Sequence, residues 1–135
     1  MLYRAICKLE ETFMKISSFN PLIVSSKGEE LISLFEELGF EKQHTVEQVT
    51  ESGVVNVDMK DAQGNQIDIA LTKNVDRDLT LIRINVENFE EAFDFLTSRG
   101  FINMGGESRV ESEHAKSAMM ISPSGFAFNL CQHKK

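Results

Sequence analysis

The stretch EELISLFEELGF at residues 29–40 recurs in outline as EEAFDFLTSRGF at residues 90–101. Each copy begins with two glutamates, continues with apolar residues at helical spacing, and ends in Gly-Phe. Acidic residues favour the start of a helix, and glycine is the residue best suited to a left-handed cap at its end. Both stretches are therefore predicted to be helices that end at Gly39 and Gly100, which lie 61 residues apart.

The same offset relates two turns further along the chain. The turn DAQG ends at Gly64 and the turn SPSG ends at Gly125, again 61 residues later. Chance rarely matches a helix and a turn in one register, so we interpret the chain as two copies of one module. The copies cover about residues 16–72 and 79–132.

Hydrophobic periodicity predicts the order of elements within each module. The predicted strands share short apolar or alternating patterns and cover residues 19–24, 40–49, 54–60 and 67–71, then 79–86, 101–110, 118–121 and 126–131. The predicted apolar helix stripes consist of Leu31, Leu34, Phe35 and Leu38, then Ala92, Phe93, Phe95 and Leu96. Each module is thus predicted to be βαβββ, and the fold class to be α+β.

The composition narrows the classes of partner. The chain has 135 residues, of which 41% are hydrophobic and 26% charged, as in an ordinary globular protein. Its net charge of -7 opposes binding to nucleic acid or to an anionic membrane surface, and no apolar run is long enough to cross a bilayer. Cys7 and Cys131 form no CxxC motif, and no secretory signal is recognised. We therefore expect a cytoplasmic protein without a disulfide framework.

The tandem βαβββ order, the Gly-Phe helix ends and the DAQGN turn before a last strand resemble the vicinal oxygen chelate superfamily. This superfamily includes glyoxalase I, extradiol dioxygenases, methylmalonyl-CoA epimerase and bleomycin resistance proteins. The resemblance implies a single glyoxalase-like domain over residues 16–135. In this fold the two modules form a curved, incompletely closed eight-stranded mixed sheet around a ligand cleft.

Residues 1–15 precede the repeat and have no counterpart in the second module. Leu2, Ile6, Leu9 and Phe13 recur at helical spacing, which predicts an N-terminal amphipathic helix. That helix would cover a sheet edge or contact a second subunit, and two-module members of the superfamily commonly form homodimers. Alternatively, residues 1–13 come from a wrongly assigned start codon, because Met14 by itself begins a compact module.

Enzymes of the superfamily bind a divalent metal through His or Glu on the first and last strands of each module. The resemblance places these four positions at Asn20, Leu81, Asp68 and Asn129. Leu81 has no electron pair to donate, and neutral amides are poor ligands for the softer divalent metals. We therefore expect no metal and no other cofactor, with a divalent metal bound at a non-standard place as the alternative.

Four residues are candidates for ligand binding: Asn20, Asp68, Arg83 and Asn129. Asp68 either faces the cleft as an acid or lies on the solvent side of its strand. Arg83 interrupts an apolar strand, where it would either bind a carboxylate or phosphate or form an internal ion pair with Asp68. His44 is the other weak catalytic candidate beside Asp68, whereas His114, His133 and both cysteines lack any activating neighbour in the sequence.

Three functions are compatible with these residues. The first is a metal-independent protein of the bleomycin-resistance type that binds a small organic molecule in the cleft. The second is a lyase, isomerase or epimerase, or dioxygenase of the superfamily with a non-standard site, using Asp68 and His44 as acid and base. The third is a structural dimerisation module without a ligand. The sequence leaves the identity of the ligand and the question of catalysis open.

Overall fold

The structure is a computed structural model that describes residues 15–47, 54–104, 110–111 and 115–133. The first module comprises β1 (Ile16–Ser25), α2 (Gly28–Glu37), β2 (Glu41–Glu47), β3 (Val55–Lys60) and β4 (Gln66–Leu71). The second comprises β5 (Leu79–Val86), α3 (Phe89–Ser98), β6 (Ile102–Asn103), β7 (Val110–Glu111), β8 (Ala115–Ile121) and β9 (Ala127–His133). The predicted N-terminal helix lies outside the described residues.

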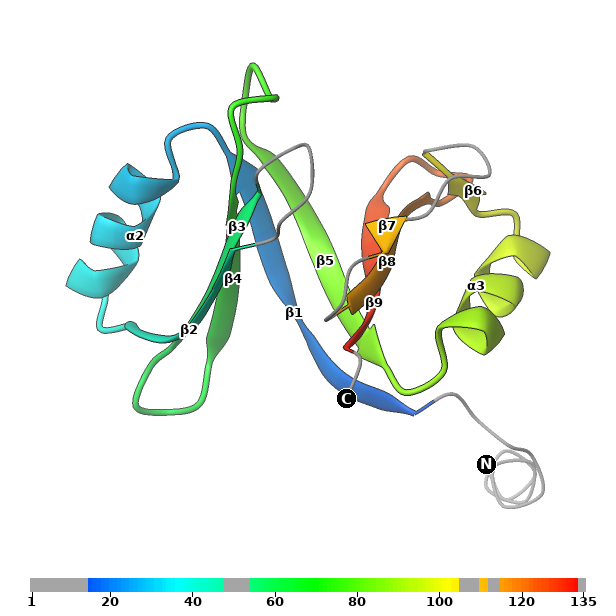
Figure 1. The fold of residues 1–135 in the computed structure, drawn as a ribbon, viewed down its shortest axis with the longest axis horizontal. Coiled ribbons are helices and arrows are strands. Elements are labelled where there is room, and N and C mark those ends of the chain that lie inside the picture. Colours follow the sequence, from blue (N-terminus) through cyan, green and yellow to red (C-terminus); the bar gives the residue numbers. More distant parts are fainter. Residues whose placement is uncertain (1–14, 48–53, 105–109, 112–114, 134–135) are drawn as a thin grey trace.

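One mixed sheet runs through both modules in the order β2-β3-β4-β1-β5-β9-β8-β6. The long strands β1 and β5 pair antiparallel at its centre and join the two halves (Figure 1). Each central strand also pairs in parallel with the last strand of its own module, so that Leu22 lies opposite Asp68 and Arg83 opposite Asn129. These two pairs are related by the 61-residue offset, and they confirm the predicted repeat.

The predicted strand at residues 101–110 is divided. The described residues there form β6 and β7, two short strands that both pair with β8. Together they take the place that β2 holds in the first module. The prediction of an open eight-stranded mixed sheet is therefore confirmed, with one strand present as two pieces.

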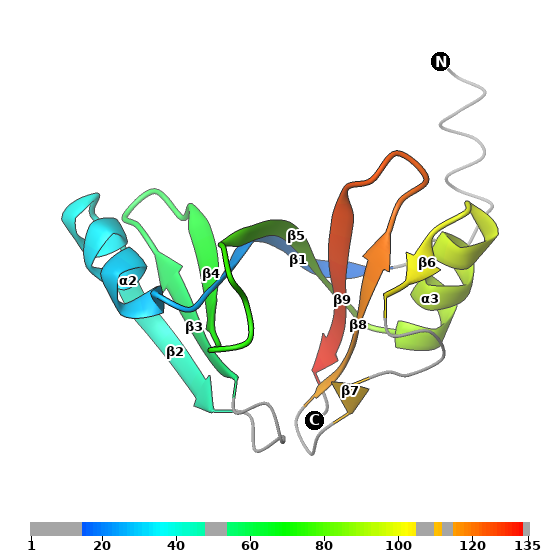
Figure 2. The same ribbon diagram turned by 90° about the horizontal axis from the view of Figure 1, so that it is seen from above.

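Both helices cover the outer face of the curved sheet, one on each half (Figure 2). They end as predicted, because Gly39 and Gly100 take positive φ angles of 103° and 90°. The predicted apolar stripes are confirmed in part: Leu31, Phe35, Ala92, Phe93 and Leu96 pack into the cores. Leu34, Leu38 and Phe95 were predicted wrongly, because they are 48%, 62% and 42% exposed. The residues that face the sheet are Gly28, Leu31, Ile32 and Phe35 in α2, and Phe89, Ala92, Phe93 and Leu96 in α3. In α2 the observed and the predicted sets both follow the spacing i, i+3, i+4 and i+7, so periodicity alone could not distinguish them. In α3 the sets differ by one residue, because Phe89 and not Phe95 faces the sheet.

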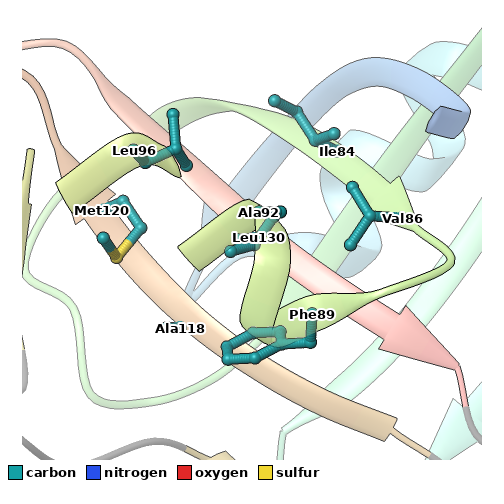
Figure 3. Close-up of a cluster of buried hydrophobic side chains, with 8 residues drawn as sticks. All are labelled: Ile84, Val86, Phe89, Ala92, Leu96, Ala118, Met120 and Leu130. Atoms are coloured by element: carbon teal, nitrogen blue, oxygen red, sulfur yellow. The ribbon is translucent and has the colours of Figure 1, made fainter. Parts of the chain in front are cut away.

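Each helix contributes to a separate apolar core. Under α3, the buried residues are Ile84, Val86, Phe89, Ala92, Leu96, Ala118, Met120 and Leu130 (Figure 3). Under α2, they are Ile32, Val57, Met59, Ile67 and Ile69. The stability of the fold is thus shared between two similar cores, which leaves the opposite, concave face of the sheet to other side chains. None of the described helices is long and apolar enough to cross a membrane.

Candidate functional site

The candidate site lies on the concave face of the sheet, opposite the helices. In β4, Ile67 and Ile69 pack into the core under α2, so Asp68 between them points to the other face. In β5, Ile84 packs under α3, so Arg83 beside it also points to the concave face. The alternation of β4 and β5 thus brings a carboxylate and a guanidinium from different modules onto one surface.

Arg83 is the centre of a hydrogen-bond network that joins the two modules. Its Nη1 donates to Asp68 Oδ2 at 3.1 Å, its Nε donates to Asn129 Oδ1 at 2.9 Å, and its Nη2 donates to Asn56 Oδ1 at 2.9 Å. Gln66 Nε2 donates to the second carboxylate oxygen of Asp68 at 3.0 Å. The side chains of Arg83 and Asp68 are 12% and 2% exposed. The internal ion pair, one of the two roles considered for Arg83, is therefore present.

Two further predicted positions border this network. Asn20 is the backbone partner of Arg83 across β1 and β5, and it is only 5% exposed. Its Nδ2 donates to Pro21 O at 3.0 Å, while its buried Oδ1 has no partner in the part of the chain that the structure describes. Leu81 lies in a buried apolar cluster with Leu22 and Ala70. Three of the four ligand-binding candidates thus meet directly in one network, and Asn20 lies beside it.

The residues at the superfamily's metal positions do not fit a divalent metal. Asp68 supplies the carboxylate of this set, but both of its oxygens already accept hydrogen bonds, one of them from a guanidinium. Leu81 offers no donor atom, and Asn129 Oδ1 accepts from Arg83. A cation placed beside Arg83 would also be repelled by its charge. Among the residues with described side chains, no three His, Cys, Asp or Glu residues are grouped so as to hold a metal.

Two members of the network were not predicted from the sequence. Asn56 and Gln66 have ordinary polar side chains; Asn56 lies between two valines in β3, and Gln66 begins β4 just before Ile67. The available signal was strand alternation: Gln66 is two residues from Asp68 and shares its face, and Asn56 alternates with Val55 and Val57. The polar residues of β3 and β4 could therefore have been assigned to one face from the sequence. Their contacts with Arg83 could not, because Arg83 lies in the other module.

The structure describes the surroundings of one of the two cysteines, Cys131. Cys131 is 6% exposed, and burial raises the pKa of its thiol. The guanidinium of Arg83 lowers that pKa in part, while the carboxylates of Asp68 and Asp58 raise it further. Cys131 is thus held as a neutral thiol, in agreement with its predicted inertness.

The backbone of His44 pairs with that of Asp58 in β2 and β3, but the side chain of His44 lies outside the described part of the structure. His114 and Cys7 also lie outside it, and His133 is an exposed residue at the end of β9. The possible acid–base role of His44 therefore stays a prediction.

Comparisons with known proteins agree with this architecture. A methylmalonyl-CoA epimerase from Mycobacterium tuberculosis matches with a TM-score of 0.68 at 10% identity, covering 93% of each chain. A glyoxalase/bleomycin resistance protein/dioxygenase superfamily member from Vibrio splendidus 12B01 matches with a TM-score of 0.56 at 14% identity, covering 87% of this chain and 99% of that one. The chain has the vicinal oxygen chelate fold.

A glyoxalase I variant from Zea mays has the same fold over 90% of this chain and 45% of its own, with a TM-score of 0.62 at 12% identity. No protein-family model and no curated protein matches the chain. At such low identities the vicinal oxygen chelate fold is what is shared, and proteins with several different activities have it. Function must therefore be argued from the residues on the concave face.

Proposed function

We propose that this chain is a metal-independent binding protein for a small organic molecule, which is held on the concave face of the sheet. The observation that carries the proposal is that the Arg83 network lies where superfamily enzymes would bind a metal. At the four positions that would bind a metal, this chain has an apolar side chain, two amides and a carboxylate paired with Arg83. Such a surface recognises polar groups by hydrogen bonding rather than by metal coordination.

The charges of the site favour a neutral or cationic ligand. Among the described side chains of the concave face, Asp58 and Asp68 are backbone partners on adjacent strands, and both act electrostatically on Cys131 together with Arg83. At the network itself, two carboxylates thus accompany one guanidinium, while Lys60, which alternation places on the same face of β3, is exposed at the end of that strand. Arg83 has five N–H groups, of which three donate within the network, and among the described residues the other two have no acceptor and are left for an uncharged acceptor on the ligand.

The same geometry disfavours Asp68 as a catalytic acid or base. A general base must come within hydrogen-bond reach of the substrate, whereas the Asp68 carboxylate is directed to Gln66 and Arg83 inside the network. At 1% exposure, the residue is also shielded from a bound molecule. The geometry therefore favours ligand binding over acid–base catalysis by Asp68 on this face.

The metal-free part of the proposal is tested by titrating Mn²⁺, Ni²⁺, Zn²⁺ and Fe²⁺ into chelator-treated protein. Calorimetry, elemental analysis and thermal stability are followed together, because a metal that binds the folded state raises the melting temperature. We expect no stoichiometric uptake, both for the native chain and for Asp68→Asn. Stoichiometric uptake that Asp68→Asn removes would refute the proposal.

The ligand-binding part is tested by a thermal-shift screen of neutral and cationic small molecules. Each compound that stabilises the protein is then titrated against two variants. Arg83→Lys keeps the charge but loses most of the network, and Arg99→Met removes an exposed arginine that lies over the Phe95 ring of α3. We expect Arg83→Lys to weaken binding and Arg99→Met to leave it unchanged. Equal affinities for both variants would place the ligand elsewhere, as would a screen in which nothing binds.

A further inference from the structure

A groove opens in the first module where two neighbouring strands separate. The pairing between β1 and β4 starts at Leu22 and Asp68, and the residues before these positions are not paired with each other. The groove has a volume of about 600 Å³, and its lining residues are Ser18, Phe19, Asn20, Pro21, Phe35, Phe40, Gly64, Asn65, Gln66 and Ile67. Most of its surface is therefore not part of the Arg83 network.

The second module contains an aromatic ring at the equivalent place. The 61-residue offset relates Phe40 to Phe101, Ile67 to Phe128 and Asn65 to Phe126. The ring centre of Phe126 lies 5.8 Å from that of Phe101 and 5.2 Å from that of Phe128, both edge-to-face. A benzyl side chain thus packs against the counterparts of Phe40 and Ile67.

In the first module the corresponding side chain is directed away from this position. Asn65 Nδ2 donates to Asp61 Oδ2 at 2.8 Å, and the Asn65 backbone N–H donates to Asp61 Oδ1 at 2.8 Å. These bonds hold Asn65 within the turn between β3 and β4. Half-buried Phe40 therefore lines the groove beside Ile67 without a ring from position 65 over it.

The polar side chains of the groove indicate which charge and which hydrogen-bonding group its ligand would have. None of its ten lining residues is charged. Asn20 lines the groove and is 5% exposed, and its Oδ1 is a buried atom that has no hydrogen-bond partner among the described residues. A buried acceptor without a partner is costly, and a donor brought by a ligand would remove that cost.

We infer that this groove binds a neutral aromatic molecule carrying an N–H or O–H donor, of the indole or phenol class. Its ring takes the place that Phe126 fills in the second module, and its donor bonds to Asn20 Oδ1. The inference goes beyond the proposed function, because it rests on the difference between the two modules and not on the Arg83 network.

The first test is the titration of indole into the native chain and two variants at position 65. Asn65→Phe supplies the first module with the ring of the second, so it is expected to fill the groove and abolish binding. Asn65→Ala removes the same hydrogen bond to Asp61 without adding a ring, and it is expected to retain binding. Calorimetry gives the affinity, and the expected result is one indole per chain, lost only in Asn65→Phe.

The second test measures the contribution of the donor. Benzofuran has the shape of indole but lacks its N–H group, so it is expected to bind about five-fold more weakly, as for one hydrogen bond of ordinary strength. Asn20→Leu, which copies the Leu81 of the second module, is expected to make the two affinities equal. Equal affinities in the native chain would overturn the assignment of Asn20.

Backbone amide shifts locate the ligand independently of any variant. Indole is expected to shift the signals of residues 18–21 and 64–67 in the native chain. Shifts centred on Arg83 and Asn129 would instead place indole in the concave site and overturn the inference. So would the absence of saturable binding, or binding that Asn65→Phe retains.

Discussion

Replacing Arg83 with methionine tests whether the network on the concave face is one buried unit. Methionine keeps the length and apolar stem of the side chain but removes every donor. The carboxylate of Asp68, 2% exposed, would then keep only Gln66 as a partner, and Asn56 and Asn129 would each lose one. Removing one partner of a buried ion pair costs about 3–5 kcal/mol. For a chain of this size, such a loss lowers the melting temperature by about 10–20 °C.

The double variant Arg83→Met with Asp68→Leu provides the matched comparison. It removes both charges, so no buried carboxylate is left without its cation, and replacing a whole pair by apolar side chains is often neutral. We expect the double variant to regain at least half of the stability lost in Arg83→Met, as measured by urea denaturation with circular dichroism. The reasoning would be refuted by a loss below about 1 kcal/mol in Arg83→Met, or by strictly additive effects of the two substitutions.

Three other features give separate predictions. A Cβ atom at Gly28 would lie 2.3 Å from Leu71 Cγ, so Gly28→Ala is expected to reduce the free energy of unfolding by about 1–3 kcal/mol, as measured by urea denaturation. The hydrogen bond from the Asn65 side chain lowers the pKa of Asp61 below its ordinary value of 3.8. Asp61→Ala should therefore be less stable than the native chain at neutral pH, and thermal melts should show this difference shrinking as the pH falls below 3.8. With the other cysteine replaced by serine, Cys131 should react with iodoacetamide far more slowly in the folded chain than in urea, because its thiol is buried and its pKa is raised.

The fold was predictable because two local signals were repeated at one offset. The helix ends at Gly39 and Gly100 and the later turns at Gly64 and Gly125 all require positive φ, which the structure shows at each of them. Such a backbone requirement can be recognised at a single position, because glycine takes a positive φ more readily than other residues. The side of α2 that faces the sheet was predicted only in part, because two overlapping stripes on this helix satisfy the same period and only the packing on the sheet selects between them.

The site was predictable in part. Strand alternation placed Asp68 and Arg83 on faces that could meet, and their ion pair was one of two open alternatives. The sequence could not show that Asn56 completes the network, because Arg83 and Asn56 meet only through the pairing of strands from different modules. The predicted homodimer, the N-terminal helix and the role of His44 depend on partners or residues outside the described structure, and they stay predictions.

Comparison of the two modules indicates where this chain has diverged from a symmetric repeat. Equivalent backbone positions carry Asp68 and Asn129, Asn20 and Leu81, and Asn65 and Phe126. Asp68 and Asn129 both belong to the concave network. In the other two pairs the polar member, Asn20 or Asn65, lines the groove, while its counterpart packs against apolar side chains. The two sites argued above thus coincide with the positions where the repeat is broken, as expected if binding rather than folding has set these residues.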